Sequence, residues 1–482
     1  MSESLKQKTV KGLAWNTVNN LSTRGIGFLL GILLARLLTP EDYGLIAMIG
    51  VFSAVLSVFV DSGMSTALIR KQNRTEEDFS TVFYFNLVVS CCVYLILFIA
   101  APYIADFYGL PQLTLLTRVL TIGIVISALG GIQGAVMSIS LDFKTPAKIS
   151  IVTTLLSGLV GLTFAFYGFG VWALVVQGLF TIILSTIGKI YFVRWIPKKP
   201  FSKQSFTDLF GFSSKMLASS LISNIYENMY TILIGKFFSA SELGLYSRAQ
   251  SLAQFPSSNA TGILQSVTFP VLSKMQGDEN RLAINYRRML RLSAYIIFPM
   301  MIGLSFVADS FIQFVLNDKW LDAVPYLKII CFSFMWYPIH AINLNLLQVK
   351  GRSDLFLRVE IIKRALGVLM LCITIPMGLM AMCYGSVIMS VIALFINTYY
   401  TGKLIHVGII KQLGDVFPIL VDCFIMGGLC WFVQQFVEHS GGKLLIAFII
   451  GFIYYVLSSV VRKSSEMSEL LSLIRKNEKD TL

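Results

Sequence analysis

Long apolar runs recur along the whole chain, and each is long enough to cross a membrane. A helix needs about 20 mostly apolar residues to span the ~30 Å hydrocarbon core of a bilayer. Fourteen such runs are separated by short polar connections: 12–38, 43–68, 80–104, 113–138, 147–167, 171–193, 206–237, 242–270, 286–315, 322–348, 355–376, 379–402, 414–436 and 443–461. The sequence therefore predicts an all-α polytopic membrane protein with fourteen transmembrane helices.

The distribution of charge supports this class and excludes another. Only 13% of the 482 residues are charged, against about 25% in ordinary soluble domains. A net charge of +13 would suggest nucleic-acid binding in a soluble protein. Here, however, Lys and Arg concentrate in the loops after even-numbered helices and in both tails, which is the positive-inside pattern. We therefore expect both termini in the cytoplasm and no nucleic-acid partner.

A Pro-Lys-Lys-Pro segment at 197–200 divides the helices into two sets of six. Because each set has an even number of helices, both sets start from the same side of the membrane. Such lobes are parallel repeats, related by an axis along the membrane normal. The predicted domains are an N-lobe at 1–200, a C-lobe at 201–402, two further helices within 403–461 and a cytoplasmic tail at 462–482.

The turn after the first helix has an echo in the second set. The matched pairs are Thr39 with Ser239, Asp42 with Glu242, and Gly44 with Gly244. Both turns follow a helix with a polar stripe, so they occupy the same topological position. Self-similarity of this kind indicates a duplication.

The first helix is not apolar all round. Asn16, Asn20 and Arg24 are spaced four residues apart and therefore share one face. A charge at bilayer depth costs roughly 2.5–3.5 kcal/mol or more, so this face is expected to line a wet cavity or a tight helix contact. Asn224 belongs to a similar polar stripe on the predicted helix 206–237.

Other ionisable residues also fall inside predicted helices. Arg118 and Arg248 lie in the outer halves of their helices, where a cation can alternatively extend to the membrane interface. Asp61, Glu227 and Glu360 are deep enough to bind H⁺ or Na⁺ as coupling ions. The alternative for each carboxylate is a structural ion pair or a place at a helix end.

Several catalytic classes leave no motif in the sequence. There is no G-x-x-x-x-G-K-[ST] phosphate loop, no G-x-S-x-G and no H-E-x-x-H, and Cys and His have no metal-ligand spacing. A polytopic polymerase or ligase would need a sizeable outer loop, which the predicted topology lacks. We therefore expect no catalytic residues, no cofactor and no metal.

Several short segments are distinctive. They are LLTPEDYGLIA at 37–47, Asp61-x-Gly63 with ALI at 67–69, GLYSRA at 244–249, PVLSKMQ at 270–276, Lys319-Trp320, and KGRSD at 350–354. Together they resemble the Wzx-type polysaccharide flippases of the colanic-acid-exporter branch. That superfamily also contains the MATE drug exporters and the lipid II flippases, so the resemblance implies a MATE-like fold with two six-helix lobes around a central cavity.

The resemblance also implies a function and a site. The expected activity is transfer of undecaprenyl-pyrophosphate-linked oligosaccharide across the bacterial cytoplasmic (inner) membrane, with membrane lipids and polysaccharide polymerase machinery as further partners. Family members carry cationic cavity residues, and Arg24 and Arg248 occupy fitting positions. The predicted substrate site comprises Arg24, Arg248, Asn16, Asn20, Arg118 and Asn224. A MATE-like drug or cation antiporter and a polytopic polysaccharide polymerase or ligase remain alternatives.

Overall fold

The computed structural model describes residues 22–61 and 63–469, and the regular structure within these ranges is helical. Compactness divides the chain into two units, Met1–Gly244 and Leu245–Leu482. The predicted lobes divide it instead near residue 200, because they are defined by symmetry rather than by contact. The lobe boundaries therefore stay a prediction.

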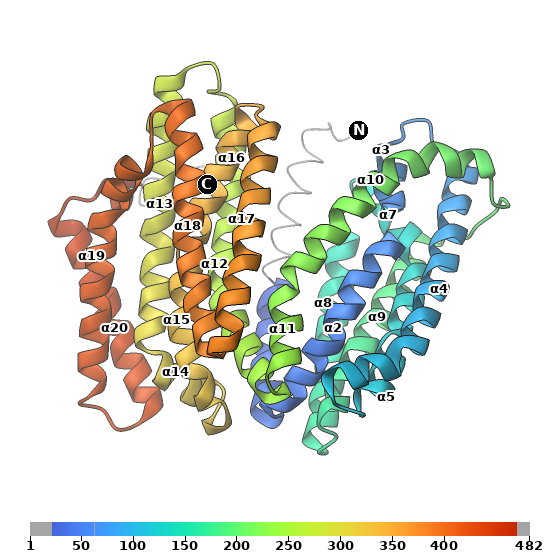
Figure 1. Cartoon of the computed structure of the whole chain (residues 1–482), viewed down its shortest axis with the longest axis horizontal. Helices are drawn as coiled ribbons and strands as arrows, with labels where there is room; N and C mark the ends of the chain where they lie inside the picture. Colours follow the sequence, from blue (N-terminus) through green and yellow to red (C-terminus); the bar gives the residue numbers. More distant parts are fainter. Residues whose placement is uncertain (1–21, 62, 470–482) are drawn as a thin grey trace, which may run out of the picture. The chain divides into compact units, whose positions relative to one another are not determined.

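Unit 1 is a bundle of helices of very different lengths (Figure 1). It contains a helical segment at 22–37, α2 (Pro40–Asp61), α3 (Met64–Arg70), α4 (Glu76–Tyr108), α5 (Leu113–Leu120), α6 (Ile122–Leu129), α7 (Gly131–Ile139), α8 (Lys144–Phe166), α9 (Val171–Val193), α10 (Lys203–Glu227), α11 (Met229–Phe237) and the start of α12 (Ala240–Ser273). The long helices α8 and α9 pack side by side. A Cβ on Gly161 would lie only 2.9 Å from Cβ of Gln177, so a small residue permits this close packing.

The connection from α9 to α10 is fastened to the start of α4. Trp195 Nε1 donates a hydrogen bond to Glu76 Oε1 (3.0 Å), and Ser202 N donates to Thr81 Oγ1 (3.0 Å). The Pro-Lys-Lys-Pro segment lies between these two contacts. The segment at 197–200, where the sequence divides the helices into two sets, is therefore attached to the start of α4.

Lys71 neutralises a carboxylate that is closed to solvent. The Asp78 side chain is 0% exposed, and Lys71 Nζ lies 2.8 Å from its Oδ1. Removing one member of a buried pair costs about 3–5 kcal/mol, because the other charge stays buried. We expect the lower end of that range for Lys71→Ala, since the Lys71 side chain is 29% exposed. Thermal unfolding of the purified protein measures the loss.

The exposed lysine Lys198 provides the control for this prediction. Lys198→Ala should leave the unfolding midpoint unchanged, and adding Asp78→Ala to Lys71→Ala should recover part of the loss, because no buried charge then remains. A midpoint for Lys71→Ala equal to that of Lys198→Ala would contradict the assignment.

Unit 2 is built around α13 (Glu279–Phe306), which packs beside α19 (Figure 1). The other elements are the rest of α12, α14 (Ala308–Val315), η1 (Asp318–Ala323), α15 (Val324–Phe334), α16 (Tyr337–Val349), α17 (Ser353–Thr374), η2 (Ile375–Met377), α18 (Leu379–Ile405), α19 (Ile409–Gln434) and α20 (Ser440–Val461). Tyr286 and Phe298 of α13 and Trp320 of η1 are the largest fully buried side chains. The largest side chains in the core of unit 2 are therefore aromatic, and two of the three belong to α13.

A buried polar cluster joins the middle of α16 to the end of α18 and the start of α19 in unit 2. Asn343 Nδ2 of α16 donates to Gln412 Oε1 of α19 (3.0 Å), and Thr401 Oγ1 of α18 donates to Asn343 Oδ1 (2.8 Å). Gln412 Nε2 also donates to the Val407 carbonyl (2.9 Å). Buried polar groups stabilise a fold when their hydrogen bonds are made, so this cluster fixes α16, α18 and α19 to one another.

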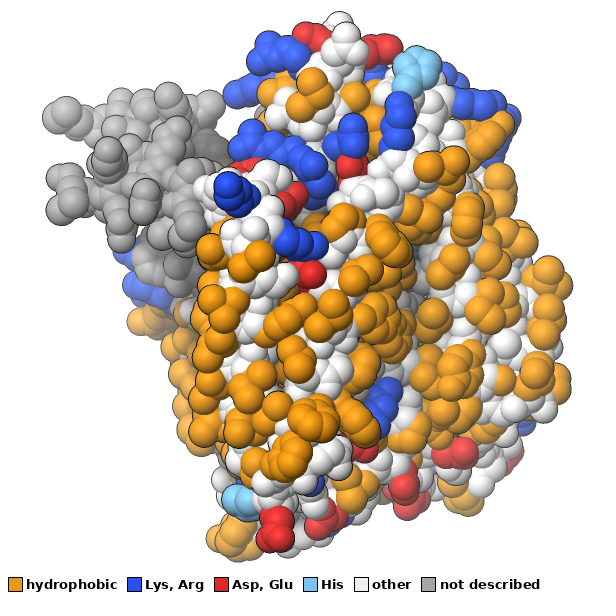
Figure 2. Space-filling view, turned by 90° about the vertical axis from the view of Figure 1, so that its left-hand side faces the viewer, with side chains coloured by type: hydrophobic (Ala, Val, Ile, Leu, Met, Phe, Trp, Pro, Cys, Tyr) orange, Lys and Arg blue, Asp and Glu red, His pale blue; other side chains and the backbone are white. Residues whose placement is uncertain are grey.

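Nine helices in the described ranges are long and apolar enough to cross a membrane, or ten if the bent pair Leu113–Leu129 and Gly131–Ile139 is one span. The side of unit 2 that carries α19 and α20 presents a broad apolar band, with Lys and Arg gathered toward its upper end (Figure 2). Lys403 lies at the end of α18, Lys411 at the start of α19, and Arg462 and Lys463 directly after α20. The chain is an all-helical polytopic membrane protein.

Candidate functional site

The two turns that echo one another in sequence make the same hydrogen bonds. Thr39 N donates to Asp42 Oδ2 (2.9 Å), and Asp42 N donates to Thr39 Oγ1 (3.3 Å). In the second turn Ser239 N donates to Glu242 Oε2 (3.0 Å), and Glu242 N donates to Ser239 Oγ (3.1 Å). This reciprocal pattern satisfies free N–H groups at a helix start. The echo is therefore one of local structure as well as of sequence.

The two capped helix starts also cross in direct backbone contact. A Cβ on Gly44 would lie 1.8 Å from the carbonyl oxygen of Ala240, and a Cβ on Gly244 would lie 1.8 Å from that of Pro40. All four residues belong to unit 1. Equivalent positions that contact each other reciprocally are related by a local two-fold axis. Glycine is required at both positions, because a side chain has no room.

Arg24 lies on the helical segment 22–37, and this segment packs on α8. The contact is close because a Cβ on Gly158 would lie 2.2 Å from Leu30 Cδ1. Arg24 itself is exposed. The other predicted members of its stripe, Asn16 and Asn20, lie outside the described residues.

The polar helix α10 stops within the predicted span 206–237. It ends at Glu227, and α11 continues the path after Asn228 (Figure 1). Asn224 Nδ2 donates to the Ser220 carbonyl (3.0 Å), and Asn228 Nδ2 donates to the Asn224 carbonyl (2.9 Å). Broken helices at membrane depth line cavities or lie within protein rather than facing lipid. The break therefore marks a candidate site, with Asn224 and the exposed Glu227 one turn apart.

Arg118 makes a different contact. Its guanidinium carbon lies 4.3 Å from the centre of the Phe98 ring of α4, and its Nε donates to the Phe98 carbonyl (3.3 Å). A cation over an aromatic face is a stabilising contact, so Arg118 links α5 to α4. The side chain of Asp61, at the end of α2, lies outside the described part of the chain.

Arg248 and Glu360 are the predicted site residues of unit 2. Arg248 follows Gly244 by one turn of α12 and is partly buried. Glu360 of α17 pairs with Lys363 (Oε1 to Nζ, 2.5 Å), and Arg364 Nε lies 3.9 Å from its Oε2. The i, i+3 and i, i+4 spacings are those of ion pairs along one helix. The Glu360 carboxylate therefore has cationic neighbours on its own helix, and its role in ion coupling stays a prediction.

The sequence matches a known family over much of this architecture. The family described as "Polysaccharide biosynthesis protein" matches residues 33–325, which is more than half of the chain. The chain belongs to this family. This polysaccharide biosynthesis protein is a transporter rather than an enzyme, and its resemblance to the Wzx-type flippases is confirmed.

Two curated relatives illustrate the membership. The protein is 26% identical over 478 residues to the teichuronic acid biosynthesis protein TuaB of Bacillus subtilis (strain 168), a match that covers 97% of this chain and 98% of TuaB. It is 25% identical over 366 residues to the lipopolysaccharide biosynthesis protein WzxC of Escherichia coli (strain K12), which covers 75% and 74% of the two chains.

Two solved structures share the fold. The inward closed conformation of the lipid II flippase MurJ superposes with a TM-score of 0.75 at 16% identity, covering 93% of this chain and 98% of MurJ. An inward-facing multidrug resistance MATE family transporter has a TM-score of 0.60 at 14% identity, covering 81% and 95%. At such identities the likeness concerns the fold alone. The predicted MATE-like fold is confirmed.

Proposed function

We propose that this protein flips undecaprenyl-pyrophosphate-linked oligosaccharide units across the cytoplasmic membrane of a bacterium for surface polysaccharide biosynthesis. Family membership supports export in polysaccharide biosynthesis. The fold is shared with MurJ, which is a lipid II flippase. Membrane lipids and polysaccharide polymerase machinery are the proposed partners.

The observation that carries the proposal is the segregation of polar residues into a few helices. In the described ranges, three helical segments are not among the apolar spans. The first is α10 together with α11, the second is α12 and the third is α17. They contain Glu227, Arg248 and Glu360 respectively, and Arg24 belongs to the predicted first helix, 12–38. Polar helices of a membrane protein turn their charges away from lipid. With the ten apolar spans, these four helices give the proposed fourteen.

The topology completes the proposal. Helices 1–6 and 7–12 form parallel lobes at 1–200 and 201–402, and both termini face the cytoplasm. The alternation of basic loops supports this orientation. The reciprocal turns support the duplication, because corresponding residues of the two turns meet at Gly44 and Gly244.

Charge chemistry accounts for the choice of residues. A pyrophosphate crossing the membrane loses hydration, and a cationic path offsets this loss. Arginine suits the task because its planar guanidinium binds phosphate through two parallel hydrogen bonds. Arg24, Arg248, Asn16, Asn20 and Asn224 are proposed to line this path, with Arg118 at its edge. The polyprenyl tail can stay in lipid, and the direction of transport comes from an ion gradient or from consumption of the product.

Depletion of the protein in the cells that make it tests the function. Undecaprenyl-pyrophosphate-linked oligosaccharide should accumulate in the membrane while surface polysaccharide falls. The lipid-linked pool is measured by mass spectrometry of extracted lipids, and an unchanged pool alongside an altered resistance to cationic drugs would contradict the proposal.

Glu227, Asp61 and Glu360 are proposed as ion-coupling carboxylates. Glu227→Gln keeps the size of the side chain but removes the charge that attracts H⁺ or Na⁺. We expect it to abolish the stimulation of export by an imposed ion gradient while export without a gradient continues. Glu438→Gln alters an exposed carboxylate between α19 and α20 and is the matched control.

The same measurement applies to Asp61→Asn and Glu360→Gln. If all three variants respond to the gradient as fully as Glu438→Gln does, carboxylate coupling is rejected.

A further inference from the structure

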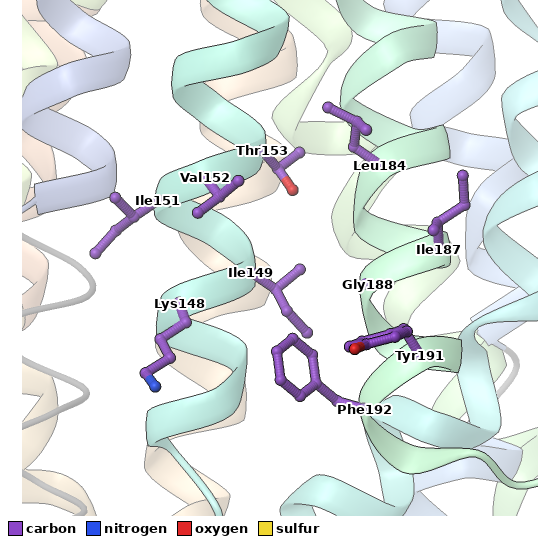
Figure 3. Close-up of a pocket in the computed structure, with 10 residues that line it drawn as sticks. All are labelled: Lys148, Ile149, Ile151, Val152, Thr153, Leu184, Ile187, Gly188, Tyr191 and Phe192. Carbon is purple, nitrogen blue, oxygen red and sulfur yellow. The ribbon is translucent and has the colours of Figure 1, made fainter.

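An apolar groove runs between α8 and α9 on unit 1 (Figure 3). Its volume is about 570 Å³, within the roughly 300–1,000 Å³ of small-ligand sites. Most of the residues that line it are apolar, and Val152 and Ile187 on its walls are 54% and 57% exposed. The groove is therefore open to the surroundings of the protein and offers little to a polar ligand.

A close helix contact sets the depth of the groove. A Cβ on Gly188 would lie 2.9 Å from Cγ2 of Ile149, so α8 and α9 approach each other closely where this glycine faces Ile149. Figure 3 shows the Phe192 ring extending between the helices beside Ile149. Next to this contact the large side chains stand apart and leave the groove between them.

Lys148 and Arg194 lie at the same end of the groove. Lys148 lines it from the first turns of α8. Across from it, Tyr191 lines the groove from the last turn of α9, and the guanidinium carbon of Arg194 lies 5.7 Å from the centre of the Tyr191 ring. Both cations belong to the end of α8 and α9 that the loop charges assign to the cytoplasm.

We propose that this groove binds one acyl chain of an anionic phospholipid from the cytoplasmic leaflet, with the lipid phosphate at Lys148 and Arg194. The charge is complementary, because basic residues at this membrane surface attract anionic head groups. The length is also suitable. Leu184 to Phe192 covers about 12 Å of helix at 1.5 Å per residue, which is close to the ~15 Å depth of one leaflet and short for a polyprenyl chain.

Native mass spectrometry of the full-length protein tests this site. The protein is extracted from nanodiscs that contain both phosphatidylglycerol and phosphatidylcholine, and the retained lipids are counted. We expect one phosphatidylglycerol per protein. Lys148→Ala with Arg194→Ala should weaken its retention about 30-fold, since each basic residue at the membrane surface contributes about 1 kcal/mol. Val152→Trp, which fills the groove, should also reduce retention.

Matched controls separate the groove from the rest of the surface. Lys198→Ala removes an exposed lysine that does not line the groove, and Leu159→Trp enlarges a 56% exposed side chain of α8 outside it. Both should retain phosphatidylglycerol like the wild type. Equal retention of phosphatidylcholine, or retention that survives both groove variants, overturns the proposal. Displacement of phosphatidylglycerol by undecaprenyl phosphate would also overturn it.

Discussion

Replacing Arg24 with alanine is expected to reduce polysaccharide export about 10- to 100-fold while the protein still accumulates in the membrane. A hydrogen bond to a charged group contributes about 1.5–3 kcal/mol, and each 1.4 kcal/mol is roughly tenfold in affinity. Arg24 is exposed on the segment 22–37, and we propose that it binds the pyrophosphate of the substrate. Arg24→Lys should restore export only in part, because lysine lacks the planar fork that binds two phosphate oxygens.

The matched control is Arg36→Ala. Arg36 is also exposed on the same helical segment, but it lies about 18 Å further along it at 1.5 Å per residue. Export is measured as surface polysaccharide per amount of protein in the membrane, in cells where the variant replaces the resident copy. If Arg24→Ala exports as well as Arg36→Ala, Arg24 has no part in transport.

A second variant separates substrate binding from a structural ion pair. Asp61 is the carboxylate at the end of the next helix, and a pair between it and Arg24 is the competing explanation. If the pair were structural, Arg24→Ala combined with Asp61→Ala would regain export, because no lone charge would remain. If Arg24 binds pyrophosphate, the double variant stays as inactive as Arg24→Ala.

Apolar run length made the regular spans predictable. The runs 147–167 and 171–193 correspond to α8 (Lys144–Phe166) and α9 (Val171–Val193), because a span facing lipid must be long and apolar over its whole length. The interior of the polar span 206–237 was not predictable in this way. It breaks at Asn228 without a proline, so hydropathy leaves no mark of the interruption.

Contacts in the candidate site also differ in how far the sequence predicts them. The ion pair of Glu360 with Lys363 could be anticipated, since the two residues are one turn apart on one helix. The contact of Arg118 with Phe98 joins two different helices, and a single sequence carries no signal for such a pairing. The groove beside Gly188 depends likewise on which helix faces that glycine. Sequence indicates the polarity of each helix, whereas packing decides which polar residue is available to a substrate.

The reciprocal glycine contact leads to a large expected effect on stability. Gly44→Ala and Gly244→Ala should each destabilise the protein by at least the ~1–3 kcal/mol typical of overpacked cores. The added Cβ would lie 1.8 Å from a backbone carbonyl oxygen in both cases, and a backbone atom cannot move aside as the end of a side chain can. Gly50→Ala, also in α2, has no atom within 4 Å of its Cβ and should be neutral or stabilising by up to ~1 kcal/mol.

The double variant shows whether the two glycines share one contact. Either alanine alone must push the crossing helix starts apart, and that movement makes room for the other. The combined loss in Gly44→Ala with Gly244→Ala should therefore be close to that of one single variant, whereas independent sites would add. Thermal unfolding of the four purified forms, with Gly50→Ala as the reference, measures both effects. Additive losses, or single losses no larger than that of Gly50→Ala, would mean that the two helix starts do not meet through these glycines.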